Sequence, residues 1–140
     1  MIERRQIRSE SGRQTDPVIL IVEDEVLIRM MIADELRRAG YAVIEAATAR
    51  EAAEVFNSGN AEVALVFSDV CMPGSMDGVE LAKLIRARRP SVKILLTSGH
   101  LNDVDCADHD SFFSKPYEVA AVIGRIKSLL GEELTGEPYL

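Results

Sequence analysis

The sequence has no apolar run long enough to cross a membrane. Its longest apolar runs, such as Val18–Val22, are only a few residues long, whereas a membrane-spanning helix needs about 20 apolar residues. The first residues, Met1–Asp16, also contain no apolar segment like the one at the centre of a signal peptide. We therefore predict a cytoplasmic protein with no membrane partner.

Positive charge is also scarce. The net charge is -7, with 16 lysines and arginines against 23 aspartates and glutamates. Because binding to nucleic acid phosphates requires a basic face, this balance argues against a nucleic acid partner. The arginines near the N-terminus are largely offset by acidic neighbours, so we interpret residues 1–16 as a flexible arm.

Cysteine is nearly absent. Cys71 and Cys106 form no CxxC pair, and they make no metal-ligand pattern with His100 or His109. We expect two free thiols in a reducing compartment, and neither a disulfide nor a zinc site.

The chain does contain enough apolar material for one core. It has 140 residues, of which 47% are hydrophobic and 28% charged, a composition typical of a single globular domain. We predict that the domain spans residues 17–131 and that a polar tail, residues 132–140, follows it.

Apolar runs alternate along the chain with segments of helical periodicity. A run that is apolar at every position predicts a strand buried on both faces. The predicted strands are Val18–Val22, Tyr41–Ala46, Val63–Phe67, Val92–Leu96 and a short one around Phe112–Phe113. The predicted helices are Val26–Ala39, a short one that opens at the capping-box pattern Thr48–Glu51 and ends near Gly59, one from an N-cap at Asp77 to Pro90, and a last one from Val119 to Leu130.

Repeated strand–helix units give a parallel sheet with right-handed crossovers and helices on both faces. We therefore predict an α/β fold with a doubly wound five-stranded parallel sheet, although spacing alone leaves the strand order open. The helical signal is weak between Gly99 and Asp110, where Leu101, Val104 and Ala107 are the only residues that support it. We expect this fourth helix to be short, frayed or missing, and Asn102–Asp110 to be the most mobile part of the domain.

Polar side chains follow four of the five predicted strands. Glu23 and Asp24 come after the first strand, Asp69 after the third, Thr97 after the fourth and Lys115 after the fifth. Open parallel sheets bind their ligands beyond the carboxyl ends of the strands. We therefore expect these five side chains to share one rim of the sheet.

Three carboxylates on one rim repel one another, and a hard divalent cation relieves that repulsion. Mg²⁺ prefers oxygen ligands and keeps open positions for a phosphate oxygen. Lys115 adds a positive charge and Thr97 adds a hydroxyl donor, so together these groups suit a transferring phosphoryl group. One carboxylate would serve as the nucleophile, but this reasoning does not say which one.

The motifs that carry these residues resemble those of a known family. The resemblance is to the response-regulator receiver domains of two-component signalling, and it rests on Val22–Glu25, Ser68–Asp69 with Met72–Pro73 and Met76–Gly78, Leu96–Ser98, and Ser114–Pro116. Each motif is weak alone, whereas the complete set in this order is specific. The resemblance runs from about Pro17 to Gly131 and implies the flavodoxin-like receiver fold.

The resemblance implies a phosphoacceptor and a Mg²⁺ site. In receivers, a histidine kinase or phosphotransfer protein phosphorylates the aspartate that ends the third strand, which implies Asp69 here. The acidic pair after the first strand implies that Asp24 binds Mg²⁺ directly and that Glu23 binds it directly or through water. The backbone carbonyl of Cys71 is implied as a further ligand, so that the thiol of this residue is incidental.

The resemblance also implies a switch. Thr97 is expected to move toward the phosphoryl group, and Lys115 to contact one of its oxygens. Phe112 falls at the aromatic position of the fifth strand that changes rotamer with the threonine, whereas Phe113 is expected in the core. The new negative charge would draw in Thr97 and Lys115 and so bias a surface around the fourth helix, the fifth strand and the last helix.

Two segments depart from the family pattern. The loop Met72–Asp77 is one residue longer than usual, which bears on the local metal geometry. The segment Gly99–Ser111 is shorter than usual and lacks a run of small residues, so we do not assume the family's common mode of dimerisation. We expect a monomer or a weak dimer.

Several functions are compatible with these residues. The leading prediction is a stand-alone receiver, not an enzyme, that signals by docking to another protein, because no output domain follows Gly131. One alternative is a phosphate shuttle or sink in a phosphorelay. Another is a degenerate receiver that only binds, against which the intact set of site residues argues. A different class of function is an enzyme with an aspartyl-phosphate intermediate, such as a small phosphohydrolase. Such enzymes usually have a second aspartate two residues after the nucleophile. This chain has Cys71 there, which argues against that class.

Overall fold

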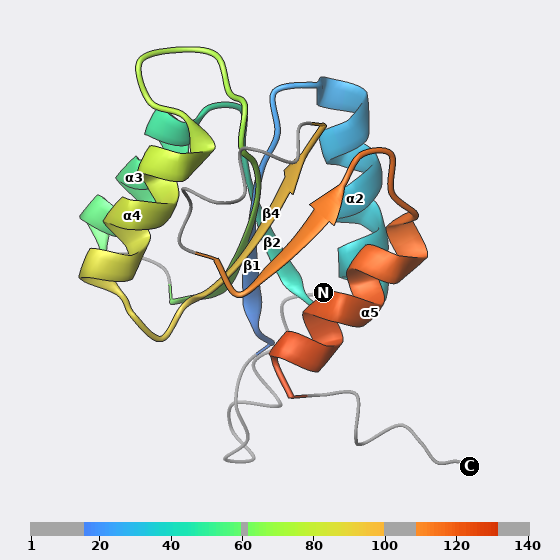
Figure 1. Cartoon of the computed structure of the whole chain (residues 1–140). Coiled ribbons are helices and arrows are strands. Elements are labelled where there is room, and N and C mark those ends of the chain that lie inside the picture. Colours follow the sequence, from blue (N-terminus) through green and yellow to red (C-terminus); the bar gives the residue numbers. More distant parts are fainter. Residues whose placement is uncertain (1–15, 60–61, 100–108, 132–140) are drawn as a thin grey trace, which may run out of the picture.

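The computed structural model describes residues 16–59, 62–99 and 109–131 (Figure 1). Strands and helices alternate there as the sequence predicts, except between the fourth and fifth strands, where residues 100–108 are not described. The elements are β1 (Val18–Val22), α2 (Val26–Arg38), β2 (Ala42–Ala46), α3 (Ala49–Ser58), β3 (Val63–Asp69), α4 (Gly78–Arg88), β4 (Lys93–Ser98), β5 (Ser111–Ser114) and α5 (Val119–Leu129). The predicted arm before residue 16, the predicted tail and residues 100–108 of the weak helical segment lie outside the described residues. Within the described ranges, no helix combines the length and the apolar content needed to span a bilayer.

The five strands form one sheet in the order β2-β1-β3-β4-β5, with every pair of neighbours parallel. This confirms the predicted doubly wound five-stranded sheet and supplies the strand order that the sequence left open. The order reverses between β1 and β3, which is where such sheets bind their ligands. The carboxyl ends of the strands are aligned there, since Val22 pairs with Ser68 and Asp69 pairs with Thr97.

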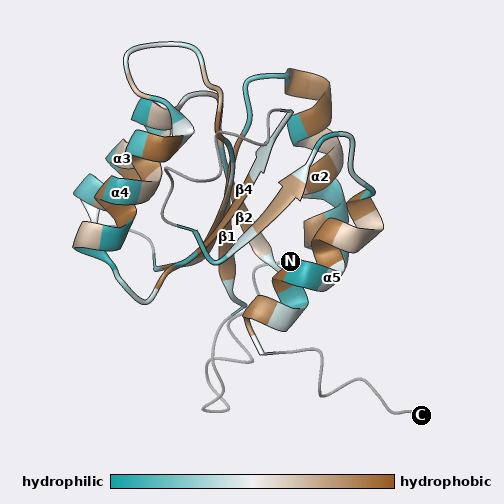
Figure 2. Ribbon diagram, in the orientation of Figure 1, coloured by the Kyte–Doolittle hydropathy of each residue, from teal (hydrophilic) through white to brown (hydrophobic). Residues whose placement is uncertain are grey.

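Different helices cover the two faces of the sheet (Figure 1). The helices α2 and α5 pack on the face that carries Ile19 and Ile21, and α3 and α4 pack on the face that carries Leu20 and Val22. Because successive side chains of a strand point to opposite faces, a strand between two helical layers must be apolar throughout. Figure 2 shows the result, with hydrophobic residues along the central strands and on the inner sides of the helices.

The predicted caps at the starts of α3 and α4 both form, but only the cap of α4 is a complete capping box. At the start of α4, Asp77 Oδ1 accepts a hydrogen bond from the Glu80 N–H (2.9 Å), and Glu80 Oε1 accepts one from the Asp77 N–H (3.0 Å). This is a complete capping box. At the start of α3, Thr48 Oγ1 accepts from the Glu51 N–H (3.1 Å), but Glu51 accepts from the Ala47 N–H instead of completing the box.

Two strands continue beyond the apolar runs that predict them. The strand β3 extends through Ser68 to Asp69, and β4 extends through Thr97 to Ser98. The added residues stay extended because they pair with neighbouring strands: Asp69 pairs with Thr97, Ser68 with Leu96 and Ser98 with Ser114. In addition, the Val70 N–H donates to the Thr97 carbonyl at 2.8 Å. The backbones of Asp69 and Thr97 are therefore held by the sheet itself.

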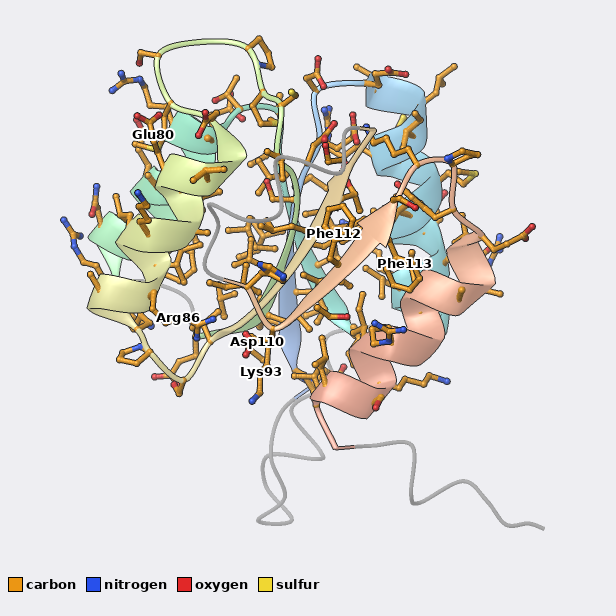
Figure 3. The ribbon with its side chains drawn as sticks, viewed as in Figure 1. Glu80, Arg86, Lys93, Asp110, Phe112 and Phe113 are labelled. Carbon is orange, nitrogen blue, oxygen red and sulfur yellow. The ribbon has the colours of Figure 1, made fainter. Side chains whose placement is uncertain are left out.

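The start of β5 is fixed by the carboxylate of Asp110 (Figure 3). Its Oδ2 accepts hydrogen bonds from the Ile94 N–H (2.8 Å) and from Arg86 Nη2 (3.1 Å), and the Asp110 N–H donates to the Ile94 carbonyl (2.7 Å). Burial raises the pKa of Asp110, but the bonds from Ile94 and Arg86 and the charges of Arg86 and Lys93 outweigh it, so the pKa lies below its usual value of 3.8. Asp110 thus ties β5 to β4 and to the end of α4.

We expect Asp110→Asn to lower the free energy of unfolding by about 1 kcal/mol at neutral pH, because the variant loses a charged acceptor of two hydrogen bonds. The folded pKa of Asp110 is depressed, so its contribution is fully present above the unfolded pKa, near 3.8, and is lost as the pH falls through the folded pKa. Urea unfolding of both proteins over a range of pH measures the difference.

Asp34→Asn is the matched control for this experiment. Asp34 is an exposed ion-pair partner of Arg37 on α2, so its replacement should change the free energy of unfolding by less than about 0.5 kcal/mol. An equal effect of the two substitutions would contradict the role given to Asp110.

Candidate functional site

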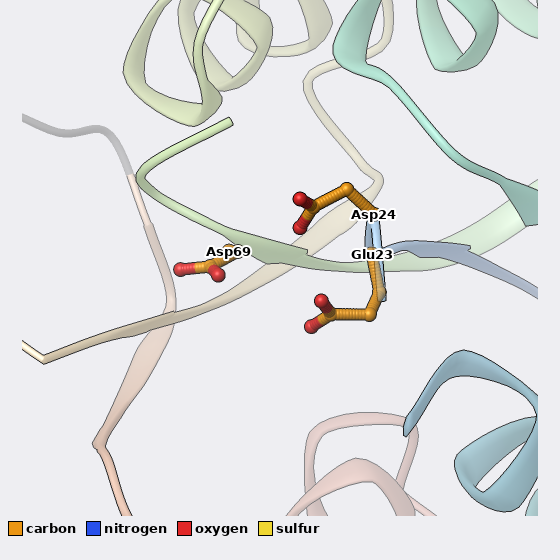
Figure 4. A group of neighbouring side chains, drawn as sticks. All are labelled: Glu23, Asp24 and Asp69. Atoms are coloured by element: carbon orange, nitrogen blue, oxygen red, sulfur yellow. The ribbon is translucent and has the colours of Figure 1, made fainter. Parts of the chain in front are cut away.

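Three carboxylates meet at the carboxyl ends of β1 and β3 (Figure 4). One carboxylate oxygen each from Glu23, Asp24 and Asp69 lies within 4.8 Å of the others. The strands β1 and β3 are neighbours in the sheet, and the acidic pair directly follows β1, so the topology brings the three groups together. Glu23 and Asp69 are buried, with exposures of 4% and 7%, whereas Asp24 is exposed.

Lys115 reaches this acidic pocket from the end of β5. Its Nζ lies 2.6 Å from Oδ2 of Asp69, and its backbone N–H donates to the Ser98 carbonyl at 2.9 Å. Burial lowers the pKa of Lys115, but the hydrogen bond to Asp69 and the charges of Asp69 and Glu23 outweigh it and raise the pKa above its usual value of 10.5. Lys115 therefore holds a positive charge beside Asp69 at neutral pH.

Glu23 points into the pocket and is held there by its own loop. Its Oε2 accepts a hydrogen bond from the Glu25 N–H at 3.0 Å. Burial raises the pKa of Glu23, as do the charge of Asp69 and a hydrogen bond with Asp24, whereas the Glu25 N–H and the charge of Lys115 lower it. The pKa of Glu23 ends above its usual value, as expected for a buried carboxylate among like charges.

This set of donors fits a bound Mg²⁺. The pocket offers carboxylate oxygens, which are the ligands that Mg²⁺ prefers, and the single ammonium of Lys115 does not balance three carboxylates. Burial, first, and the charge of Asp69 raise the pKa of Glu23, and a divalent cation bound at this place would favour its charged form. Glu23, Asp24 and Asp69 are the side chains that would hold the ion.

The other predicted site residues lie in the neighbouring strands and loop. Thr97 pairs with Asp69 across β3 and β4 and is buried. Phe112 packs against the core on the side of α3 and α4, whereas Phe113 packs on the opposite side of the sheet (Figure 3). Cys71 is exposed in the loop after β3. The switching roles of Thr97 and Phe112 and the ligand role of the Cys71 carbonyl stay predictions.

Gly78, which the sequence pointed to only as part of a motif, packs directly against the backbone of Asp69. A Cβ atom on Gly78 would lie 2.2 Å from the Asp69 carbonyl oxygen and 2.8 Å from the Val70 Cα, and the Gly78 N–H donates to the Val70 carbonyl at 2.8 Å. Only a residue without a side chain fits there. The available signal was a glycine just inside the N-cap of a helix, where glycine is otherwise unfavourable.

A groove of about 500 Å³ opens beside the acidic pocket. Glu23 and Lys115 line its polar side, and Ile28, Met31, Tyr117 and Val119 are among its apolar lining. Next to the groove, the start of α2 exposes four large apolar side chains, namely Val26, Leu27, Met30 and Met31. Figure 2 shows the ribbon at this end of α2 coloured as hydrophobic. Met31 is 48% exposed, although it is apolar and directly precedes the fully buried Ile32. We call these four residues the α2 patch.

The family model of the response regulator receiver domain matches residues 19–127, which is most of the chain. The chain belongs to this family. Solved receiver structures superpose on it. A CheY-like receiver protein from Methanospirillum hungatei has a TM-score of 0.77 and 29% identity, and the match covers 87% of this chain and 100% of that one. The response regulator TrrA from Thermotoga maritima, solved in complex with Mg²⁺-BeF, has a TM-score of 0.70 and 30% identity, over 81% of this chain and 98% of TrrA.

Curated relatives contain the receiver domain within longer chains. The sensor kinase CckA of Brucella abortus is 29% identical over 136 residues, which is 94% of this chain but 14% of CckA. The transcriptional regulatory protein ResD of Bacillus subtilis is 34% identical over 116 residues, which is 80% of this chain and 47% of ResD. The receiver therefore spans less than half the length of either relative.

We expect Gly78→Ala to lower the free energy of unfolding by at least about 2 kcal/mol, because the added Cβ collides with backbone atoms and forces α4 or the end of β3 to move. Urea unfolding measures this change. Gly124→Ala is the matched control, because Gly124 is also helical but an added Cβ meets nothing within 4 Å. The control should stabilise the protein by about 0.5–1 kcal/mol. Wild-type stability of Gly78→Ala would rule out the close approach.

Proposed function

We propose that this receiver accepts a phosphoryl group on Asp69 from a phosphohistidine of a histidine kinase or phosphotransfer protein, and that it passes on the signal by binding another protein. The observation that carries the proposal is the Lys115 ammonium, 2.6 Å from Asp69 within a cluster of three carboxylates. Phosphoryl transfer depends on positioning and on neutralised charge more than on covalent help from the protein. Membership in the receiver family supports the same chemistry.

The proposed step forms one bond and breaks one. A carboxylate oxygen of Asp69 bonds to phosphorus while the bond from phosphorus to the imidazole nitrogen of the donor breaks. The electron pair of the broken bond stays on the imidazole, which takes up a proton from solvent, and Asp69 becomes an acyl phosphate. Lys115, already beside the carboxylate, offsets the negative charge on the phosphoryl oxygens.

Mg²⁺ is the proposed cofactor. Glu23, Asp24 and Asp69 would hold it, with the backbone carbonyl of Cys71 as a further ligand. When bound, the ion supplies Lewis-acid neutralisation of phosphoryl oxygens. The complex of TrrA with Mg²⁺-BeF supports this choice of ion, as does the preference of Mg²⁺ for an all-oxygen donor set.

Thr97 and Phe112 are the proposed switch residues. The Thr97 backbone pairs directly with Asp69, and a phosphoryl oxygen on Asp69 is a strong hydrogen-bond acceptor for the Thr97 hydroxyl. Phe112 directly precedes Phe113, the residue of β5 that pairs with Thr97, and it is only partly buried. Movement of Thr97 would therefore change the packing of Phe112 through the adjacent residue Phe113.

We expect incubation with acetyl phosphate and Mg²⁺ to add one phosphoryl group to the wild-type protein, measured as a gain in intact mass. Asp69→Ala should show no gain, because the nucleophile is gone, and a chelator in place of Mg²⁺ should remove most of the gain from the wild type. Asp34→Asn, at an exposed carboxylate on α2, should be modified like the wild type.

Two outcomes of this mass measurement would contradict the proposal. A gain that survives in Asp69→Ala would mean that another residue is the acceptor. No gain in the wild type, with acetyl phosphate or with any phosphorylated kinase, would leave a receiver that acts only as a binding module.

The α2 patch is the proposed docking face for the phosphodonor protein. The donor must bring a histidine to Asp69, so it must cover the surface next to the acidic pocket. The four residues of the patch are 48% to 80% exposed, and grouped apolar side chains of this size mark interaction surfaces. Met31 also lines the groove that contains Glu23 and Lys115, so the patch is continuous with the acceptor site.

We expect Leu27→Ser to slow phosphotransfer from a phosphorylated histidine kinase by about tenfold, because Leu27 is the most exposed apolar residue of the patch. Modification by acetyl phosphate should be unchanged, since that donor needs no docking face. The kinase is selected by screening kinases against the wild-type protein.

Ala87→Ser is the control for this experiment, because Ala87 is exposed on α4, on the opposite side of the sheet. It should leave both reactions unchanged. Equal losses with kinase and acetyl phosphate for Leu27→Ser would indicate damage to the site, and no loss with the kinase would place the docking face elsewhere.

The proposal also covers the setting of the whole protein. It includes a cytoplasmic location, a monomeric or weakly dimeric state, and signalling through a protein partner. The matching relatives are a sensor kinase and a transcriptional regulatory protein, so receivers of this family serve different outputs. We propose that the output of this receiver is set by the proteins that it binds.

A further inference from the structure

Glu23 is held by three hydrogen bonds from three directions. Its backbone N–H donates to the Ala46 carbonyl at the end of β2 (3.0 Å), and its carboxylate accepts from the Glu25 N–H (3.0 Å). Its backbone carbonyl accepts from Nη1 of Arg29 at 2.7 Å. The first two bonds use backbone groups of the partner residues, whereas the third depends on the side chain of Arg29.

Arg29 is itself braced by the edge strand β2. It lies one turn into α2, and its Nε donates to Glu45 Oε1 on β2 at 3.3 Å. The other oxygen of Glu45 accepts from Nη2 of Arg37 at 3.2 Å. The side chain of Arg29 is only 16% exposed, and a planar guanidinium donates to two acceptors in fixed directions. Arg29 therefore links β2, α2 and the acidic loop in one geometry.

We propose that Arg29 is a positioning residue for the Mg²⁺ site, an inference that rests on the proposed function. By binding the Glu23 carbonyl, Arg29 fixes the peptide between Glu23 and Asp24, and with it the directions in which both side chains leave the backbone. Without this bond, the two carboxylates must be ordered at the moment that the ion binds. Groups that orient metal ligands in this way typically change metal affinity by about 10- to 100-fold.

The Mg²⁺ affinity of a variant without the Arg29 charge distinguishes positioning from two other roles, which are a charge effect and a structural ion pair. Arg29 places a positive charge near an acidic pocket, so its removal should strengthen cation binding through charge alone. Positioning predicts the opposite result, which is weaker binding. A purely structural ion pair predicts a lower melting temperature with no loss of affinity. Weaker Mg²⁺ binding by a folded variant therefore reports positioning.

The test is a calorimetric titration of the purified protein with MgCl₂ alone, with no phosphodonor present. Arg29→Met keeps the aliphatic length of the side chain but removes its donors, and we expect the Mg²⁺ affinity to fall about tenfold. Arg38→Met is the matched control, because it is the same substitution on the same helix at an exposed pair with Glu35. The control should stay within about twofold of the wild type.

Arg29→Lys provides a rescue, because lysine keeps the charge and one donor. It should bind Mg²⁺ more tightly than Arg29→Met does, although charge alone predicts the reverse order. Thermal unfolding of each variant gives its stability separately. If Arg29→Met is not folded at room temperature, the titration is repeated with Arg29→Gln at a lower temperature, with the same expected loss.

Unchanged or tighter Mg²⁺ binding by folded Arg29→Met would overturn this inference, even with a lowered melting temperature. Binding by Arg29→Lys that is no tighter than binding by Arg29→Met would also count against it. A wild-type protein that binds no Mg²⁺ would overturn the proposed function, and the inference with it. Equal binding by the wild type and the variant would overturn the inference alone.

Discussion

Like charges are crowded together at the carboxyl ends of β1 and β3, and the surrounding structure keeps them there. Carboxylate oxygens of Glu23, Asp24 and Asp69 lie within 4.8 Å of one another, an arrangement that electrostatic repulsion opposes. Lys115, paired with Asp69 at 2.6 Å, offsets part of that repulsion. The sheet resists the repulsion that remains, because two buried neighbouring strands cannot separate without unfolding. The stability of the fold thus maintains a site that is unfavourable on its own.

Three residues hold the backbone of the elements that form this site. Gly78 lets α4 begin against the backbone of Asp69, and Arg29 holds the carbonyl of Glu23. Asp110 fixes the start of β5, the strand that leads to Lys115. None of these three residues is among the groups proposed to contact a phosphoryl group. They hold the backbone from which those groups project, and the distances between charges decide how strongly the charges act on one another.

The acidic pocket and the α2 patch serve different parts of the same proposed task. Buried charges suit a transferring phosphoryl group but are a poor source of contact area, whereas exposed apolar side chains supply contact area without disturbing the charges. The groove joins the two, since Glu23 and Lys115 line it together with Met31. A partner docked on the α2 patch, as proposed, would therefore lie beside the acidic pocket.

The sequence by itself determined the order of strands and helices, the caps such as Asp77, and the residues at the strand ends, including Asp69 and Lys115, because these depend on local periodicity and on apolar runs. Only the tertiary structure decided the strand order, the exposure of Met31 and the contact between Arg29 and Glu23. These features depend on which elements become neighbours. A helical pattern is the same whether or not another element covers its apolar face, so the pattern alone cannot identify the part left exposed.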